Sequence, residues 1–183
     1  TGYTSFQKEE MISFCDFLFN EGYYERCLLT SFQILYKFPH DPMVPTIHYY
    51  IARCYEEMEN FELARKYYQK IIKDDDKGSV VFRAAEYRNQ YTNLLSGNTD
   101  DLLSNTQGTK DPYLLTFRGY AYMGKMNWEA ARTSFISAQN NFDHPHYDEL
   151  MIPLFQTIEN VSEVPKHNKY IVFLLSTIFP GGG

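Results

Sequence analysis

The chain has 183 residues and a formal net charge of −6, from 17 Lys and Arg against 23 Asp and Glu. Hydrophobic residues make up 44% and aromatic residues 17% of it, enough to bury a continuous core, which argues against a disordered chain. No Lys- or Arg-rich block occurs, so the electrostatic footprint of a nucleic-acid binder is missing. The three cysteines match neither a disulfide framework nor a Cys-x-x-Cys zinc motif.

The first predicted element is a helical hairpin at residues 8–41. Cys15 and Cys27 lie 12 places apart in it. Two antiparallel helices approach to about 8–10 Å only where a small residue sits at the crossing. We therefore interpret both cysteines as small packing residues. The run Phe-Pro-His-Asp-Pro at 38–42 breaks the chain after the hairpin.

A second hairpin, at residues 45–76, repeats this spacing and aligns without gaps with a later hairpin at residues 112–143. The paired small residues are Ala52 and Ala64 in the former, and Gly119 and Ala131 in the latter, again 12 places apart. The first members of these two pairs are separated by 67 places, twice a repeat length of about 34. One more unit is therefore expected between the two hairpins.

The expected third unit lies at residues 77–108 and is irregular. It places Ala84 at the position of the small residue in the first helix. No turn residue follows, so this helix is expected to run to Leu95. Only a short second helix, at 100–104 behind a Thr99 cap, is expected after it.

A fifth, partial unit is expected at residues 146–160, with Pro153 kinking its helix. Two loops carry clustered ligand-type side chains. The Asp74–Gly78 run lacks the spacing of an EF-hand loop. The His and Asp cluster at 143–148 surrounds a proline and a turn that would point its side chains apart, so we read it as an exposed loop. No metal is expected.

The repeated pattern resembles the tetratricopeptide repeat, whose signature spaces bulky, small and aromatic residues over a helix-turn-helix unit. The matching residues in the two regular hairpins are His48, Ile51, Ala52, Tyr55, Ala64 and Tyr68, then Leu115, Arg118, Gly119, Tyr122, Ala131 and Phe135. The first hairpin matches more loosely, through Met11, Phe14, Cys15, Leu18, Cys27, Ser31 and Pro39. The resemblance implies an all-α fold over residues 1–160, a TPR-like α-α superhelix or right-handed solenoid of helical hairpins.

In such a stack the first helices line a concave groove where partners bind. The resemblance therefore implies a protein–protein interaction scaffold that binds a peptide or protein segment, without a cofactor. By helical spacing from the small residues, the side chains expected to face the groove are Tyr49, Arg53, Glu56, Arg88, Asn89, Thr116, Tyr120 and Met123. Tyrosines at this spacing also fit plain core packing, which makes the two arginines the stronger candidates.

Motifs of common enzymes are missing from the sequence. It has no Gly-x-Ser-x-Gly elbow, no Gly-x-x-x-x-Gly-Lys phosphate loop and no His-Glu-x-x-His helix. We therefore expect a protein that is not an enzyme.

Residues 161–183 are predicted as a linker and an apolar segment. That segment, at 169–179, is too short to cross a bilayer, which takes about 20 residues. Two readings stay open, a helix that caps the last hairpin or the onset of a membrane segment. The Ser-Thr-Ile-Phe-Pro-Gly-Gly-Gly end resembles the openings of hydrophobic regions after repeat domains in some bacterial envelope proteins. The alternative function is thus the soluble repeat domain of a membrane-tethered bacterial envelope protein, with a structural or assembly role. Localisation stays open between cytoplasm and cell envelope.

Overall fold

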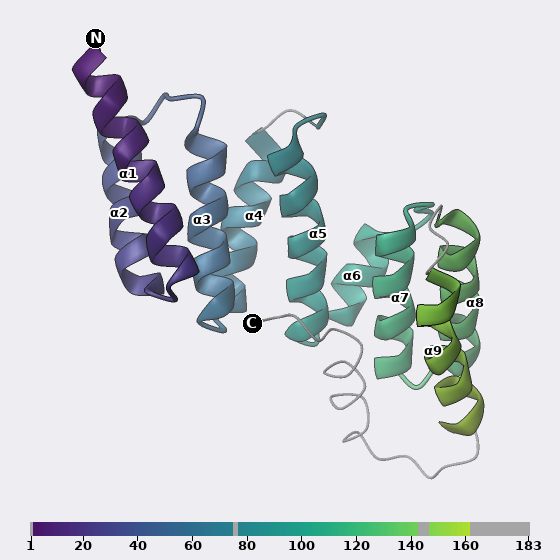
Figure 1. The fold of residues 1–183 in the computed structure, drawn as a ribbon. Helices are drawn as coiled ribbons and strands as arrows, with labels where there is room; N and C mark the ends of the chain where they lie inside the picture. The colour runs from purple at the N-terminus through teal and green to yellow at the C-terminus, as the bar shows by residue number, and fades with distance from the viewer. Residues whose placement is uncertain (1, 75–76, 143–146, 162–183) are drawn as a thin grey trace. The chain divides into compact units, whose positions relative to one another are not determined.

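A computed structural model of the chain describes residues 2–74, 77–142 and 147–161, and every regular element in these ranges is an α-helix (Figure 1). The helices are α1 (Gly2–Asn20), α2 (Tyr24–Lys37), α3 (Val44–Glu57), α4 (Phe61–Asp74), α5 (Val80–Leu95), α6 (Thr99–Asn105), α7 (Pro112–Gly124), α8 (Trp128–Asn141) and α9 (Tyr147–Val161). No strand occurs in the described ranges, so the predicted all-α fold class is confirmed.

The chain divides into two compact units, unit 1 at residues 1–96 and unit 2 at residues 97–183. Within each unit, every described helix packs on the next helix in the sequence. This neighbour-on-neighbour packing is the arrangement that a solenoid of helical hairpins requires. Each predicted hairpin contains one consecutive helix pair, and the predicted partial unit contains α9. The grouping of these helices into five repeats stays a prediction.

The small residues lie where the sequence pattern predicts close helix crossings. Cys15 and Cys27 are fully buried, and the Cys27 thiol donates to the Cys15 carbonyl oxygen at 3.4 Å. Ala52 and Ala64 are also fully buried and belong to one core cluster. The tightest crossing is at Gly119, where an added Cβ would lie 2.5 Å from Cε1 of Phe135. Only a residue without a side chain fits there unless the ring moves.

The hairpins α1–α2, α3–α4 and α7–α8 share one turn. The residue at the same repeat position has a left-handed φ in each: Gly22 at 76°, Glu59 at 58° and Met126 at 58°. The N–H of the next residue bonds a carbonyl oxygen five places back: Tyr23 to Leu18 at 2.8 Å, Asn60 to Tyr55 at 2.8 Å and Asn127 to Tyr122 at 2.9 Å. This is the Schellman arrangement, which satisfies carbonyls at the end of the first helix. The turns therefore repeat at the same 37-place and 67-place intervals as Cys15, Ala52 and Gly119.

The third hairpin departs from its prediction by one place at two points. Ala85, and not Ala84, is fully buried in the cluster with Ala52 and Ala64. Adjacent alanines are equivalent in size, so composition alone could not choose between them. α5 does run to Leu95 as predicted, but α6 begins at Thr99, which makes Asn98 its N-cap residue.

Several sequence predictions fall on residues outside the described ranges, namely the cluster at 143–146, part of the 74–78 loop and the apolar segment at 169–179. Within the described ranges, no group of three or more His, Cys, Asp or Glu residues is placed to hold a metal ion. None of the described helices is both long enough and apolar enough to span a bilayer. Pro153 lies inside α9.

Gly119→Ala is expected to lower the free energy of unfolding by about 1–3 kcal/mol, because the new Cβ would overlap the Phe135 ring. Urea denaturation followed by circular dichroism measures this change. Gly124→Ala is the matched control on the same helix, since an added Cβ meets nothing within 4 Å there. It should leave stability unchanged or raise it by up to about 1 kcal/mol. Equal effects of the two substitutions would contradict a close crossing at Gly119.

The three thiols are expected to be inert in the folded chain. Cys15, Cys27 and Cys54 are each 0% exposed. The hydrogen bond with Cys15 favours the Cys27 thiolate, but contact with Cys54 and burial outweigh it and raise the pKa of Cys27 to about 12. Because the thiolate is the reactive form, a disulfide reagent such as DTNB at about pH 8 should modify the thiols only after denaturation. Rapid labelling of the native chain would show that the hairpin packing around them is wrong.

Candidate interaction site

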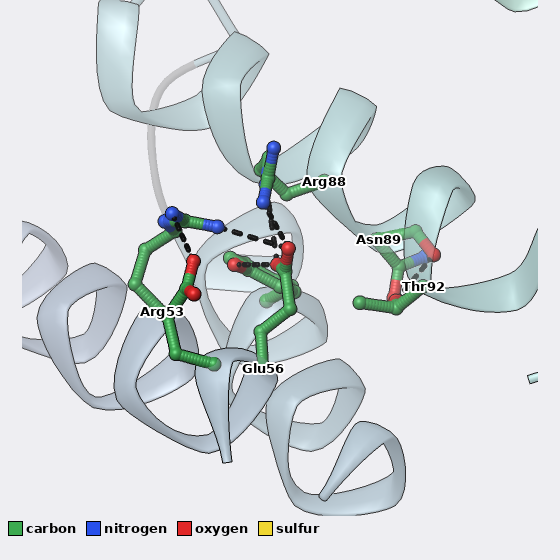
Figure 2. A network of polar contacts seen from close by, with 7 residues as sticks. Arg53, Glu56, Arg88, Asn89 and Thr92 are labelled. Atoms are coloured by element: carbon green, nitrogen blue, oxygen red, sulfur yellow. Dashed lines mark hydrogen bonds and ion pairs between the residues drawn. The ribbon is translucent and has the colours of Figure 1, made fainter. Parts of the chain in front are cut away.

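The first-helix side of unit 1 carries a compact polar network. Arg53 and Glu56 come from α3 and Arg88 comes from α5 (Figure 2). Tyr68 comes from α4. All of them converge on the carboxylate of Glu56, whose side chain is only 4% exposed. A buried carboxylate is costly unless hydrogen-bond donors surround it.

Three neighbouring side chains supply these donors. The Tyr68 hydroxyl donates to Oε2 of Glu56 at 2.6 Å. Nη1 of Arg53 donates to Oε1 at 2.9 Å. Arg88 donates to both oxygens, through Nε at 3.1 Å and through Nη2. Nη2 of Arg53 also reaches Oε1 of Glu57 at 2.6 Å. The network thus balances two guanidinium groups against two carboxylates.

The repeat explains why these side chains meet. Glu56 and Tyr68 are 12 places apart, the same separation as Ala52 and Ala64, and lie one helical turn further along each helix. The corresponding pair in unit 2 is Met123 and Phe135, which are 1% and 0% exposed. The two buried apolar side chains at these positions are thus replaced in unit 1 by a carboxylate and a phenol.

The electrostatics hold the network in its charged form. Burial disfavours the Arg88 guanidinium, but the charge of Glu56 and the hydrogen bonds to it outweigh burial and raise the pKa of Arg88. Burial and the neighbouring Glu56 carboxylate raise the pKa of Tyr68, which therefore stays a neutral donor.

Each of the two arginine side chains also contacts an aromatic ring. The guanidinium of Arg53 lies over the Phe19 ring of α1 at 5.4 Å from its centroid. The guanidinium of Arg88 lies over the Tyr91 ring at 5.0 Å. Such cation–π contacts stabilise the orientation of a partly exposed guanidinium. Each arginine is therefore held between a carboxylate and a ring.

α1 joins this face through a second polar contact. The Tyr50 hydroxyl donates to Oδ1 of Asp16 at 2.9 Å, and the rings of Phe19 and Tyr50 meet edge-on at 6.2 Å. The first helices of the two hairpins, α1 and α3, are thus tied together beside Arg53.

Comparison with known protein families gives a match for this part of the chain. Residues 48–77 match the family described as Tetratricopeptide repeat, and they cover the α3–α4 pair that holds Arg53, Glu56 and Tyr68. Residues 48–77 thus form a tetratricopeptide repeat. For this part of the chain, the match confirms the family predicted from the sequence. Comparison with curated proteins and with solved structures finds no match.

The eight predicted groove residues are distributed over both units. Five lie in unit 1 and three in unit 2: Tyr49, Arg53, Glu56, Arg88 and Asn89, then Thr116, Tyr120 and Met123. The structure brings Arg53, Glu56 and Arg88 into one network, and the Tyr49 ring contacts Tyr68 at 5.9 Å. Four of the eight are buried: Glu56, Asn89, Tyr120 and Met123, at 6%, 4%, 3% and 1% exposure. These four stabilise the fold around the site and present little surface to a partner.

Sequence analysis missed the partners of Glu56. It placed Tyr68 in the core and Arg88 in the groove without joining them. The available signal was the 12-place rule, which pairs Glu56 with Tyr68 as it pairs Ala52 with Ala64. A glutamate at that core position indicates that donors must come from the next helix.

Unit 2 has a separate shallow hollow of about 450 Å³ on α7 and α8, lined by Arg118, Tyr122, Asn127, Glu129, Ala130, Thr133 and Ser134. The Arg118 guanidinium donates there to the Leu103 carbonyl oxygen at 2.6 Å and to the Thr106 hydroxyl at 3.0 Å. These bonds satisfy the end of the short helix α6. The lining residues include no histidine or cysteine that would pair as base or nucleophile.

Tyr68→Phe is expected to lower the free energy of unfolding by about 1–3 kcal/mol, because it removes a donor from a buried carboxylate. In a Glu56→Met background the same change should cost nothing measurable, since the pair then matches Met123 and Phe135. Urea denaturation of the four proteins gives the coupling energy, expected at about 1–3 kcal/mol. An identical cost of Tyr68→Phe in both backgrounds would show that the hydroxyl does not support Glu56.

Proposed function

We propose that unit 1 binds a peptide or protein segment along the side formed by the first helices α1, α3 and α5. The tetratricopeptide repeat supports the general role of a protein–protein interaction scaffold. The groove, and the residues that contact a partner within it, are our proposal.

The observation that carries this proposal is the immobilisation of two arginines by one buried carboxylate. The side chains of Arg53 and Arg88 are 19% and 32% exposed, while that of Glu56 is 4% exposed. A guanidinium has five N–H groups, and Arg88 uses only two of them on Glu56. Because the Arg88 side chain is 32% exposed, we infer that part of its guanidinium edge can donate to a carbonyl or carboxylate oxygen of a partner.

Preorganisation makes this edge suited to binding. A long charged side chain that must be ordered on binding costs about 0.5–1.5 kcal/mol. Arg53 and Arg88 are already held by Glu56 and by the rings of Phe19 and Tyr91. The partner therefore meets two oriented donors beside half-buried aromatic rings, a combination typical of binding hot spots.

We assign direct contact with the partner to Tyr49, Arg53 and Arg88 in unit 1. Thr116 is half-buried on α7, where its hydroxyl donates to the Pro112 carbonyl oxygen at 2.8 Å, and it is proposed as a separate contact in unit 2. Glu56 holds Arg53 and Arg88 through its carboxylate. Asn89, Tyr120 and Met123 are buried, so they are proposed to stabilise α5 and α7 without direct contact with the partner. No cofactor and no catalytic step are part of this function.

Panning a random peptide display library against the 183-residue chain tests the proposal. Enriched peptides should bind the wild-type chain in fluorescence anisotropy, and Arg88→Ala should weaken them about tenfold or more, because hot-spot arginines contribute more than about 1.4 kcal/mol. Arg26→Ala is the matched control, since Arg26 is an exposed arginine on the second helix α2.

Circular dichroism of each variant separates lost binding from lost folding. Arg53→Ala should act like Arg88→Ala, because both guanidinium groups flank the same carboxylate. The proposal is wrong if no peptide is enriched, or if enriched peptides bind both variants as tightly as wild type.

A further inference from the structure

The outer side of α1 exposes three phenylalanines. Phe6, Phe14 and Phe17 are 61%, 44% and 53% exposed. The rings of Phe14 and Phe17 are stacked at 6.4 Å between centroids. Exposed aromatic residues gathered on one helix side indicate an interaction surface more often than single exposed ones do.

The neighbouring repeat shows what this side of a first helix normally contacts. Residues 37 places further on occupy the same positions in α3, and they are Ile51 for Phe14 and Cys54 for Phe17. Both are 0% exposed and lie in the core cluster that contains Cys27, Leu28 and Ile34 of α2. The helix α2 therefore covers the side of α3 that corresponds to the exposed side of α1.

Within the described residues, α1 packs on α2 and to a lesser extent on α3. Neither helix covers Phe14 or Phe17, as their exposure shows. The outer side of α1 thus has the apolar residues of a helix–helix contact without the second helix.

The exposed carboxylates on this side of α1 indicate the charge of a helix that would pack there. Glu10 is exposed on this side of α1, at the position that Ile47 occupies, fully buried, in α3. Lys8 does not neutralise it, because its ammonium group pairs with Asp41 at 2.9 Å. Glu21, at the end of α1, is exposed as well. A helix laid over this side would bury the Glu10 carboxylate, which requires a cationic partner.

We propose that the outer side of α1, formed by Phe6, Glu10, Phe14 and Phe17, docks an amphipathic helix of a partner protein with an apolar stripe flanked by Lys or Arg. The stripe packs on the phenylalanine rings as α2 packs on α3, and a basic residue pairs with Glu10. A second copy of this chain fits less well, because its α1 would bring a second Glu10 to the contact. This surface is distinct from the proposed peptide site at Arg53 and Arg88.

A synthetic helical peptide of about 18 residues, with Leu at i, i+3, i+4 and i+7 positions and Lys elsewhere on its flanks, is the probe. Its twin carries Glu in place of every Lys. In fluorescence anisotropy, the wild-type chain should bind the basic peptide about tenfold or more tightly than the twin. Glu10→Lys should abolish or reverse this preference, a result that nonspecific hydrophobic binding does not give.

The double variant Phe14→Ser, Phe17→Ser should weaken the basic peptide about tenfold, and it should fold normally because both rings are exposed. Leu29→Ser with Tyr36→Ser is the matched control, since these residues are exposed on α2 at 62% and 89%. Equal affinity for both peptides, or loss of binding only in the α2 control, would overturn the proposal. The proposal would also be overturned if sedimentation showed that the wild-type chain is a dimer and that the double variant Phe14→Ser, Phe17→Ser is a monomer. A second copy of the chain would then be the occupant of this side of α1.

Discussion

The structure depends on the close approach of two antiparallel helices at a pair of small residues 12 places apart. Ala52 and Ala64 share one core cluster, and the Cys27 thiol donates to the Cys15 carbonyl oxygen. In the hairpin of Gly119 and Ala131, Gly119 also lies so near the Phe135 ring that a Cβ has no room. Close-packed interiors tolerate little change in volume at such a point. Once the crossing is fixed, the residues one turn further along each helix are also brought face to face, whatever their chemistry.

That second pair decides how the repeats differ. In unit 2 it is Met123 and Phe135, two buried apolar side chains that need no hydrogen-bond partner. In unit 1 it is Glu56 and Tyr68, and the buried carboxylate needs more donors than one phenol supplies. Arg53 from the same helix and Arg88 from the next hairpin provide them. The cost of burying Glu56 is thereby linked to the placement of two arginines on one side of the unit, and a change at Glu56 alters stability and the proposed binding surface together.

The sequence was sufficient for the parts of the fold that follow from regular spacing. The helix pairs, the small residues at their crossings and the family could be predicted because each position is marked by residue size at a fixed interval. The register of α5 could not, because Ala84 and Ala85 are alike in size and only packing against α4 selects one. The left-handed turns at Glu59 and Met126 were hidden for a related reason, since neither residue is the glycine that usually marks such a turn.

The sequence predicted which residues belong to the candidate site, but it did not predict how they contact one another. Helical spacing selected Arg53, Glu56 and Arg88, but it treated each as a groove residue, whereas Glu56 lies beneath the other two. Glu10 can be compared across the repeats in the same way. It occupies in α1 the position that the buried Ile47 occupies in α3. Glu56 has its cations in α3 and α5, inside unit 1. Glu10 lies on the outer side of α1, where no described helix provides one. If the repeat geometry makes both positions contact positions, the carboxylate of Glu10 and the exposed phenylalanines together specify the charge and shape of the helix that we propose docks on α1.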